Sequence, residues 1–323
     1  MLYRRLGQSG LQVSALGLGC STLGEVVHGA DAENLVRDAI ELGITFIDTA
    51  ITYAGGRSEE IVGRAIAGRR DEVVLATKVG LRGGDGPYRN GLSRRRIMAA
   101  IELSLRRLGT DHVDLYQAHR PDPSTPLEET LEAMDRLVRD GKVRYVGASN
   151  YPAWQMTHAR WVSDREGLSH WVSAQNRFNL LDGLDDRHLL DASRVLGFGL
   201  IPWMPLAAGV LSGKYRPGVA APGGTRVGDL ERFRREASDE RIAAVERLKP
   251  WARERGRTTA ELGIAWLLSH PGVSTVIVGA RRREQLAENV KSIDWTLTPD
   301  EVLEAQRIAS GDPRHLDTSS NGV

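Results

Sequence analysis

Four titratable side chains stand at the ends of three consecutive apolar runs of the sequence. Asp48 ends the second run, Tyr53 follows it by five positions, Lys78 ends the third run, and His119 lies just past the fourth. Taken singly, each has an ordinary structural explanation, such as a solvated charge, a packed ring or a hydrogen-bonded histidine. Because the carboxyl ends of parallel barrel strands meet at one mouth, their joint placement indicates a catalytic site.

This set of side chains suits the transfer of a proton to a carbonyl oxygen. A tyrosine has an ordinary pKa of about 10, and a neighbouring ammonium such as that of Lys78 stabilises the phenolate and lowers that pKa. Asp48 would keep Lys78 protonated and oriented, and His119 would hydrogen-bond the substrate oxygen beside the Tyr53 hydroxyl. No side chain delivers hydride, so carbonyl reduction at this site requires a nicotinamide cofactor.

Later strand ends offer a polar surface for such a cofactor. Ser149, Asn150 and Gln175 carry groups that hydrogen-bond a carboxamide, and Trp203 offers a face for stacking. A competing interpretation is that the Ser-Asn pair forms a turn and that the tryptophan belongs to the core. A glycine turn that opens a helix after the last run would suit a phosphate and an adenine, and its residues are Gly279, Ala280, Arg281, Gln285 and Asn289. Lys214 and Arg226 would add positive charge at the same end.

The elements that position these residues alternate between short β-rich apolar runs and longer stretches of 3.6-residue period. The sequence predicts eight strand cores, at residues 15–18, 45–48, 73–77, 113–117, 143–148, 171–175, 200–203 and 275–278. It predicts helices at residues 32–42, 58–66, 93–108, 127–140, 152–165, 186–196, 239–255, 258–268, 282–292 and 299–309.

This order predicts an α/β fold, a single (β/α)8 TIM barrel with extra C-terminal helices, as one domain over residues 1–323. Residues 3–6 and 12–14 predict a β-hairpin, within residues 1–14, that plugs the N-terminal end of the barrel. A doubly wound sheet is the alternative. Its nucleotide fingerprint is absent, because Thr22 stands where the third glycine belongs, and residues 80–91 lack the ending of a P-loop.

Two segments are predicted to be irregular. Residues 216–237 form the longest such stretch and are expected to cover the cofactor. Residues 311–323 are expected to form a poorly ordered tail.

Composition narrows the function classes. The 43 Lys+Arg against 42 Asp+Glu argue against a nucleic-acid partner, since such proteins concentrate positive charge. The single cysteine and the absence of zinc-like ligand spacing predict a metal-free protein of a reducing compartment, and no run of about 18 apolar residues occurs. We therefore expect a cytoplasmic enzyme that is neither secreted nor membrane-spanning, acting on a small molecule.

Across nearly its full length, the sequence resembles the aldo-keto reductases. The resemblance rests on LYRRLGQSGLQVSALGLG at 2–19, IDTAITYAGGRSEEIVG at 47–63, LATKVG at 75–80 and DLYQAHRPD at 114–122. The cofactor segments agree as well: VGASNY at 146–151, QNRFNLL at 175–181, PLAAGVLSGKY at 205–215 and GARRREQLAENV at 279–290.

The resemblance implies NADPH-dependent reduction of aldehydes or ketones. Tyr53 would be the general acid, Lys78 and Asp48 its tuning pair, and His119 the residue that orients the carbonyl group. An extended NADPH would lie across the barrel mouth, contacted by Cys20, Ser21, Asp48, Ser149, Asn150, Gln175, Trp203, Met204, Pro205, Leu206, Lys214, Arg226, Gly279, Arg281, Gln285, Glu288 and Asn289.

The sequence departs from the family pattern at several positions. Trp203 stands where many members have tyrosine, which makes the chain similar to the potassium channel beta subunits, a branch better known for binding NADPH than for fast turnover. Arg120 stands where some members place a pocket-forming tryptophan. Gly279 and Gln285 replace a lysine and an arginine of one branch, which leaves Arg281 and Lys214 for the 2′-phosphate and makes NADH a possible cofactor. Smaller departures are Ala54 for a common glycine and Val278 for a frequent proline.

Two other functions are compatible with these residues. One is an NADPH-holding sensor or partner subunit with slow turnover, and the other is a Schiff-base aldolase that uses Lys78 as an amine nucleophile. The choice of carbonyl compound would be set by the loops at residues 25–30, 80–91 and 120–125.

Overall fold

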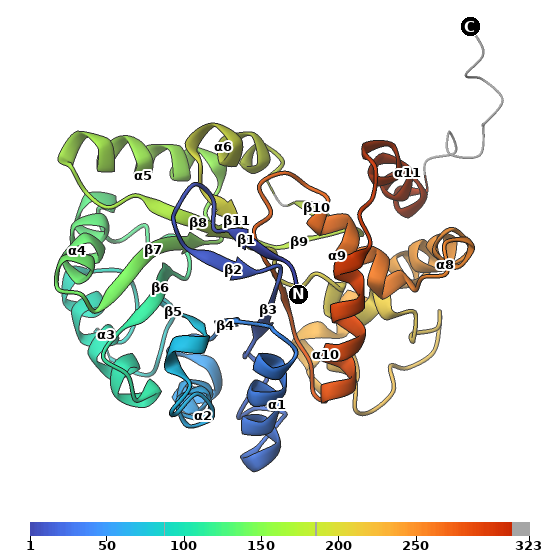
Figure 1. Ribbon diagram of the computed structural model, residues 1–323, viewed down its shortest axis with the longest axis horizontal. Helices are drawn as coiled ribbons and strands as arrows, with labels where there is room; N and C mark the ends of the chain where they lie inside the picture. The colour runs from blue at the N-terminus through green and yellow to red at the C-terminus, as the bar shows by residue number, and fades with distance from the viewer. Residues whose placement is uncertain (87, 185, 312–323) are drawn as a thin grey trace, which may run out of the picture.

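A computed structural model describes residues 1–86, 88–184 and 186–311 of the chain. Its centre is a ring of eight parallel strands, of which the first seven pair in chain order and the eighth pairs with the first (Figure 1). These strands are β3 (Leu16–Gly19), β4 (Phe46–Asp48), β5 (Val74–Val79), β6 (Val113–Ala118), β7 (Val143–Ser149), β8 (Trp171–Gln175), β11 (Gly199–Leu200) and β12 (Val276–Val278).

The ring closes where β11 meets the segment before β12. Leu200 forms a parallel bridge with Val273, and the amide of Ile277 donates to the carbonyl of Pro202 at 3.0 Å. Since β3 lies between β4 and β12, the sheet has no topological switch point. The predicted (β/α)8 barrel is confirmed, and the doubly wound alternative is wrong.

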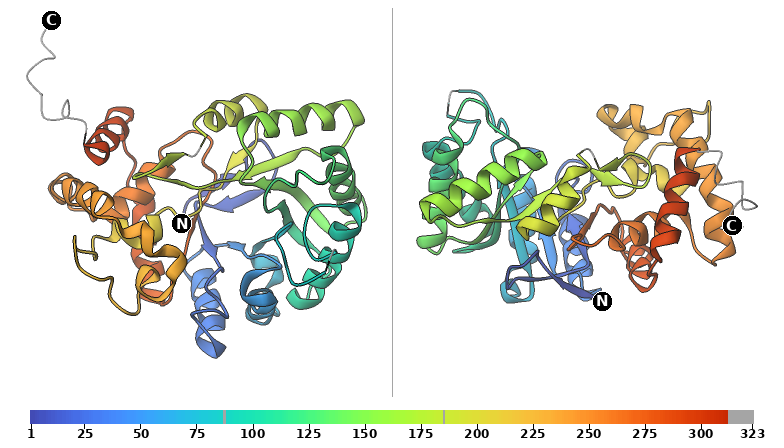
Figure 2. Two further views of the ribbon diagram at one scale, coloured as in Figure 1. Left: turned by 180° about the vertical axis from the view of Figure 1, so that it is seen from behind. Right: turned by 90° about the horizontal axis from the view of Figure 1, so that it is seen from above.

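Helices surround this ring on its outer side (Figures 1 and 2). The helices between strands are α1 (Gly29–Glu41), α2 (Arg57–Ala65), α3 (Arg94–Leu108), α4 (Leu127–Arg139), α5 (Ala153–Glu166) and α6 (His188–Leu196). The later ones are α7 (Arg226–Asp229), α8 (Asp239–Glu254), α9 (Thr259–Leu268), α10 (Arg283–Val290) and α11 (Pro299–Ser310). No helix of the described ranges is long and apolar enough to cross a membrane.

The N-terminal hairpin covers one end of the ring, as predicted. Its strands β1 (Tyr3–Arg5) and β2 (Gln12–Ser14) pair antiparallel, and their neighbours Leu6 and Val13 are fully buried. These two side chains form a cluster with residues that point into the barrel: Phe46, Ala76, Leu115, Ile201 and Ile277. At Gly7, φ is +59° and a Cβ atom would lie 2.3 Å from the carbonyl oxygen of Gly197, so only glycine allows this close approach.

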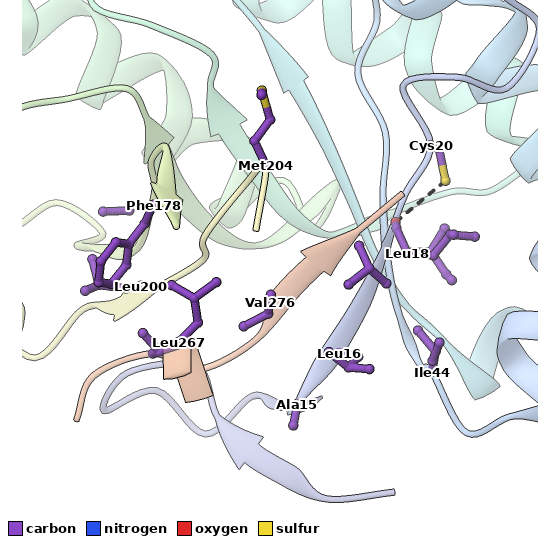
Figure 3. Packing of buried hydrophobic residues seen from close by; sticks show 14 of the residues in the cluster. Ala15, Leu16, Leu18, Cys20, Ile44, Phe178, Leu200, Met204, Leu267 and Val276 are labelled. Carbon is purple, nitrogen blue, oxygen red and sulfur yellow. Dashed lines mark hydrogen bonds between the residues drawn. The ribbon is translucent and has the colours of Figure 1, made fainter. Parts of the chain in front are cut away.

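A larger apolar core fills the space between the strands and the helices. Figure 3 shows part of it, with Leu16 and Leu18 of β3, Ile44 before β4 and Val276 of β12 among the apolar side chains drawn. Strands covered on both faces are apolar almost throughout, which is why the sequence shows continuous apolar runs. This packing fixes the strands whose carboxyl ends carry the polar side chains.

The structure corrects three of the sequence predictions in detail. Regular pairing in the seventh strand covers only Gly199–Leu200 and not residues 200–203, because Pro202 lacks an amide hydrogen and Met204 has a positive φ of 56°. Residues 216–237 contain helix α7 and a 3-10 helix at Glu231–Ala237. A short hairpin of β9 (Phe178–Asn179) and β10 (Gly183–Leu184) was not expected. Of the predicted tail, residues 312–323 lie outside the described residues.

Candidate active site

A cavity of about 780 Å³ opens at the carboxyl ends of the strands, and we name it the central cavity. Asp48, Tyr53 and His119 line it, whereas Lys78 lies fully buried behind its wall. Asp48 is the last residue of β4, and Lys78 pairs in register with Gln117 of β6. The four predicted catalytic side chains are therefore gathered at one end of the barrel.

The Lys78 ammonium is the centre of a buried hydrogen-bond network. Its Nζ donates to Oδ2 of Asp48 at 2.5 Å, to the carbonyl oxygen of Thr49 at 2.9 Å and to the hydroxyl of Tyr53 at 3.5 Å. The other carboxylate oxygen of Asp48 accepts from Nε2 of Gln175 at 2.9 Å and of Gln117 at 3.3 Å. Every proton of the ammonium is thus directed at an oxygen, and the carboxylate accepts on both oxygens.

Sequence reasoning missed Gln117 and Thr49 in this network. Gln117 stands in register with Lys78 on the adjacent strand, so its inward position could have been read from strand alternation. Thr49 takes part through its backbone carbonyl, which no side-chain pattern reveals.

Burial and charge oppose one another at Lys78 and Tyr53. Burial by itself lowers the pKa of Lys78, but the Asp48 carboxylate and the Tyr53 oxygen outweigh it and leave that pKa raised, so the ammonium stays charged. Burial raises the pKa of Tyr53, and the nearby Lys78 charge offsets only part of that increase. Lys78 lowers the pKa of Tyr53, as predicted, but it does not bring that pKa toward neutrality, because the loss of water around the phenol is the larger effect.

His119 is neutral at physiological pH. Burial lowers its pKa well below the ordinary value, and the charges of Lys78 and Arg120 add to this effect. Its ring meets the Tyr53 ring edge-on, with centroids 5.8 Å apart. Its Nδ1 is buried without a hydrogen-bond partner among the described residues. A neutral imidazole has one N–H donor, so it is suited to hydrogen-bond an oxygen beside the Tyr53 hydroxyl.

The polar side chains predicted for the nicotinamide form a second network across the cavity. The hydroxyl of Ser149 donates to the carbonyl oxygen of Gln175 at 2.8 Å, and Nδ2 of Asn150 donates to the carbonyl oxygen of His119 at 2.9 Å. Nε1 of Trp203 donates to Oδ1 of Asn150 at 3.2 Å. The indole and the amide are thereby held in fixed orientations at the cavity wall.

Several residues of the central cavity have unusual backbone conformations. Ala54, Asn150 and Met204 line it and have positive φ values of 50°, 61° and 56°. Non-glycine residues seldom adopt this left-handed region, and such strain concentrates at functional sites. This clustering of unusual backbone conformations is a separate observation from the titratable groups, and it indicates the same cavity as the functional site.

A second cavity of about 170 Å³, the lateral cavity, adjoins the central one. Met204, Pro205, Arg226 and Gly279 line both, so the two form a continuous cleft. Of the other residues predicted to bind cofactor, the lateral cavity is lined by Leu206, Lys214, Arg281, Gln285, Glu288 and Asn289.

The lateral cavity is rich in positive charge. Nε of Arg226 and Nη2 of Arg281 are buried without hydrogen-bond partners among the described residues. Partial burial and then the charge of Arg281 lower the pKa of Lys214, while burial lowers that of Arg226. Arg281 also forms an ion pair with Asp229 at 2.6 Å. Guanidinium and ammonium side chains that line a cavity are the groups that bind phosphate oxygens.

Residues of the 216–237 segment and of the predicted substrate loops complete the central cavity. Arg232 forms an ion pair with Glu25 at 2.5 Å, and Nη2 of Arg226 lies 3.2 Å from the hydroxyl of Ser21. The Arg226 guanidinium lies 4.5 Å from the centroid of the Phe233 ring. The sequence predicted a covering segment here, but it did not single out Arg232 or Phe233. Glu25, Leu81 and Arg120 of the predicted substrate loops also line the cavity.

One predicted contact side chain points away from the cleft. Cys20 is fully buried, and its thiol donates to the carbonyl oxygen of Leu18 at 3.7 Å (Figure 3). Its neighbours Gly19 and Ser21 line the central cavity instead, since side chains alternate along an extended segment. Among the described residues, no group of three or more His, Cys, Asp or Glu side chains could hold a metal ion.

Comparisons with known proteins agree with this geometry. A family model described as the aldo/keto reductase family matches residues 15–310. The chain is 39% identical to a probable voltage-gated potassium channel subunit beta of Arabidopsis thaliana, over 97% of this chain and 98% of that protein. It is 35% identical to L-glyceraldehyde 3-phosphate reductase of Escherichia coli (strain K12), over 99% and 96%. It is also 35% identical to versiconal hemiacetal acetate reductase of Aspergillus parasiticus, over 94% and 95%.

Proposed function

The chain belongs to the aldo/keto reductase family, and we propose that it reduces aldehydes or ketones to alcohols with NADPH as hydride donor and Tyr53 as general acid. Oxidoreductase activity on carbonyl compounds follows from the family. The choice of NADPH and the roles of individual residues are the proposal.

One observation carries these roles. The Tyr53 hydroxyl lies 3.5 Å from a buried ammonium, at the wall of a cavity that His119 also lines. Burial keeps the phenol protonated, as a proton donor must be, and the Lys78 charge stabilises the phenolate left after the proton has moved. His119, held neutral, would donate a hydrogen bond to the same carbonyl oxygen.

The residues of the cleft fit a dinucleotide with a dihydronicotinamide ring. When bound, such a cofactor supplies the hydride that carbonyl carbon requires. Trp203 and the amides of Asn150 and Gln175 would hold the ring end, since all three line the central cavity. The orphaned donors of Arg226 and Arg281, with the Lys214 ammonium, would bind the phosphates. This positive charge is also what favours NADPH over NADH, because a 2′-phosphate adds two negative charges at the lateral cavity.

A Schiff-base aldolase is disfavoured on the same evidence. The amine nucleophile of such an enzyme must be neutral and accessible, whereas Lys78 is fully buried and carries a raised pKa.

The Tyr53→Phe variant tests the assignment. It removes the proton and keeps the ring, so NADPH binding should stay within about twofold while reduction of 4-nitrobenzaldehyde falls by at least about 100-fold. Tyr145→Phe is the matched control, since that ring packs against the opposite, hairpin-covered end of the barrel. Parent-like turnover by Tyr53→Phe would show that another group donates the proton.

A second candidate function is an NADPH-holding partner subunit with slow turnover. It is favoured by the similarity to proteins named as probable voltage-gated potassium channel subunits beta, and by the tryptophan at position 203. Single-turnover oxidation of bound NADPH separates the two candidates. A fast first turnover followed by much slower cycling supports the partner subunit, and equal rates support the reductase.

A further inference from the structure

A third cavity lies beside the central one and has no part in the proposed reaction. It has a volume of about 320 Å³, at the lower end of the range of ligand pockets. The turn after β4, the loop after β5 and one face of α3 enclose it. Thr52, which precedes Tyr53 in the chain, lines both this cavity and the central one. We name it the arginine cavity, after the four guanidinium groups that line it: Arg82, Arg89, Arg96 and Arg107.

Two of these four arginines have carboxylate partners. Arg82 pairs with Asp85 at 2.7 Å in an exposed position, and Arg107 pairs with the buried Glu59 at 3.2 Å. Among the described residues, neither Arg89 nor Arg96 has a carboxylate oxygen within ion-pair distance, although the charge of Glu59 acts on Arg96 from further away. The cavity therefore carries a surplus of positive charge.

Arg96 is the unusual member of this group. The sequence has three consecutive arginines at the start of α3, and Arg94 and Arg95 are exposed as surface arginines usually are. Arg96 is only 6% exposed, and its Nε is buried without a hydrogen-bond partner among the described residues. Burying a guanidinium is costly, because water solvates it less, and at Arg96 the buried Nε also lacks a hydrogen-bond acceptor. Arg107 lies eleven positions further along α3, on the same helix face.

The cavity is connected to the turn that carries Tyr53. Nη1 of Arg107 donates to the carbonyl oxygen of Ile51 at 3.0 Å, and its guanidinium packs against the backbone of Gly56. At Gly83 a Cβ atom would lie 3.4 Å from Nη2 of Arg96 and 3.7 Å from Cγ2 of Thr52, so this loop closes over the guanidinium. An occupant of the cavity would touch the same backbone that positions the proposed acid.

We propose that the arginine cavity is an anion site that binds a phosphate or carboxylate group through Arg96 and Arg89. A planar guanidinium fork matches the paired oxygens of these groups, and an anion in the cavity would add the close oxygen partner that Arg96 and Arg89 lack. The group has two possible sources, a free anion or the charged end of a carbonyl substrate whose other end lies at Tyr53. Anion binding by the cavity is independent of the proposed reaction, whereas the second source rests on the proposed function.

Inorganic phosphate is the probe for the site. Thermal unfolding of the full-length chain is followed during phosphate titration, against chloride at equal ionic strength. Arg89→Gln changes an exposed side chain and should fold normally, while Arg96→Gln removes the buried charge. The matched control is Arg106→Gln, an exposed arginine on the same helix that does not line the cavity. All are also made in a Lys214→Met background, which weakens phosphate binding by the lateral cavity.

The phosphate dissociation constant should rise at least about tenfold in Arg89→Gln and Arg96→Gln, and stay within about threefold in Arg106→Gln. Equal phosphate affinity in all variants, or no saturable effect in the parent, would overturn the proposal. This binding measurement stands whether or not the chain is a reductase.

Kinetics with charged and neutral aldehydes distinguish the two sources. If the substrate supplies the anion, Arg89→Gln raises KM for 4-carboxybenzaldehyde or a longer carboxyalkoxy benzaldehyde and leaves KM for 4-nitrobenzaldehyde unchanged. In that case phosphate also competes with the charged aldehydes in the parent. If the anion is free, phosphate changes the turnover of 4-nitrobenzaldehyde in the parent and not in Arg89→Gln. Both outcomes support an anion site.

Discussion

Replacing Lys78 with methionine tests the electrostatics of the site most directly. The side chain keeps its approximate length and loses its charge, which leaves the Asp48 carboxylate buried at 4% exposure. Oδ2 of Asp48 then has no donor, while Oδ1 keeps the two glutamine amides at 2.9 and 3.3 Å. Removing one partner of a buried pair lowers the free energy of unfolding by about 3–5 kcal/mol. Because two amides still hydrogen-bond the carboxylate, we expect a loss of about 3 kcal/mol for Lys78→Met.

The double variant Lys78→Met/Asp48→Asn separates stability from catalysis. It removes both charges together, so the free energy of unfolding should return to within about 1–2 kcal/mol of the parent. Reduction of 4-nitrobenzaldehyde should stay as low as in Lys78→Met, because no ammonium remains to stabilise the Tyr53 phenolate. Lys142→Met is the control, since it breaks a partly exposed pair with Glu102 and should cost less than about 1 kcal/mol.

Urea unfolding, with fluorescence and circular dichroism as probes, measures the stabilities, and steady-state NADPH oxidation measures the turnover. Two results would refute the reasoning. One is a Lys78→Met variant as stable as the Lys142→Met control, and the other is a double variant no more stable than Lys78→Met. Either would mean that the carboxylate is solvated or protonated once the ammonium is gone.

Three further predictions follow from the structure. The pKa of Tyr53 is raised above 10.0 and that of His119 is lowered well below 6.5, so the rate of reduction should be constant between pH 6.5 and pH 10 and fall at higher pH. A decline of the initial rate between pH 7 and pH 9 would show that burial does not dominate the Tyr53 pKa. Burial alone would raise the pKa of Glu236, but ion pairs with two arginines outweigh it and lower that pKa from 4.5 to about 2. The ionised carboxylate therefore stabilises the fold above pH 4.5, and this stabilisation is lost as the pH falls toward 2. Glu236→Gln should lower the free energy of unfolding in urea by about 1–2 kcal/mol at pH 7 and by almost nothing at pH 2. Gly56 has a φ of +101°, and a Cβ atom there would lie 2.2 Å from Cζ of Arg107. Gly56→Ala should therefore lower the free energy of unfolding by about 1–3 kcal/mol and slow turnover, and parent-like values in both assays would show that this turn tolerates the displacement.

The fold could be predicted from the sequence because its signals are local and repeated. Strands covered on both faces read as apolar runs, and the helices have clear periodicity and end signals, such as the capping box at Thr258 before α9. Most predicted boundaries lie within a few residues of the observed ones. The exceptions are the seventh strand and the covering segment of residues 216–237, where backbone conformation depends on contacts from elsewhere in the chain.

The convergence of the site could be predicted, but the balance of energies within it could not. Strand ends locate Asp48, Lys78 and His119 at one mouth, since barrel topology fixes where they meet. The sequence does not tell how much water each group loses on folding. The sign of the Tyr53 pKa shift depends on that quantity. The buried Arg96 was hidden for the same reason, within a run of arginines that otherwise looks like a solvated helix face.

The raised pKa of Tyr53 has a consequence for the direction of the reaction. In the proposed mechanism, reduction would consume a protonated phenol, which is the form that burial favours at neutral pH. Oxidation of an alcohol at the same site would need the phenolate as base, and each unit by which the pKa exceeds the pH reduces that form tenfold. The Lys78 ammonium lowers this penalty without removing it, because burial is the larger of the two effects. The buried ammonium stabilises the same phenolate in both directions, so the raised pKa should make oxidation more dependent on high pH than reduction is.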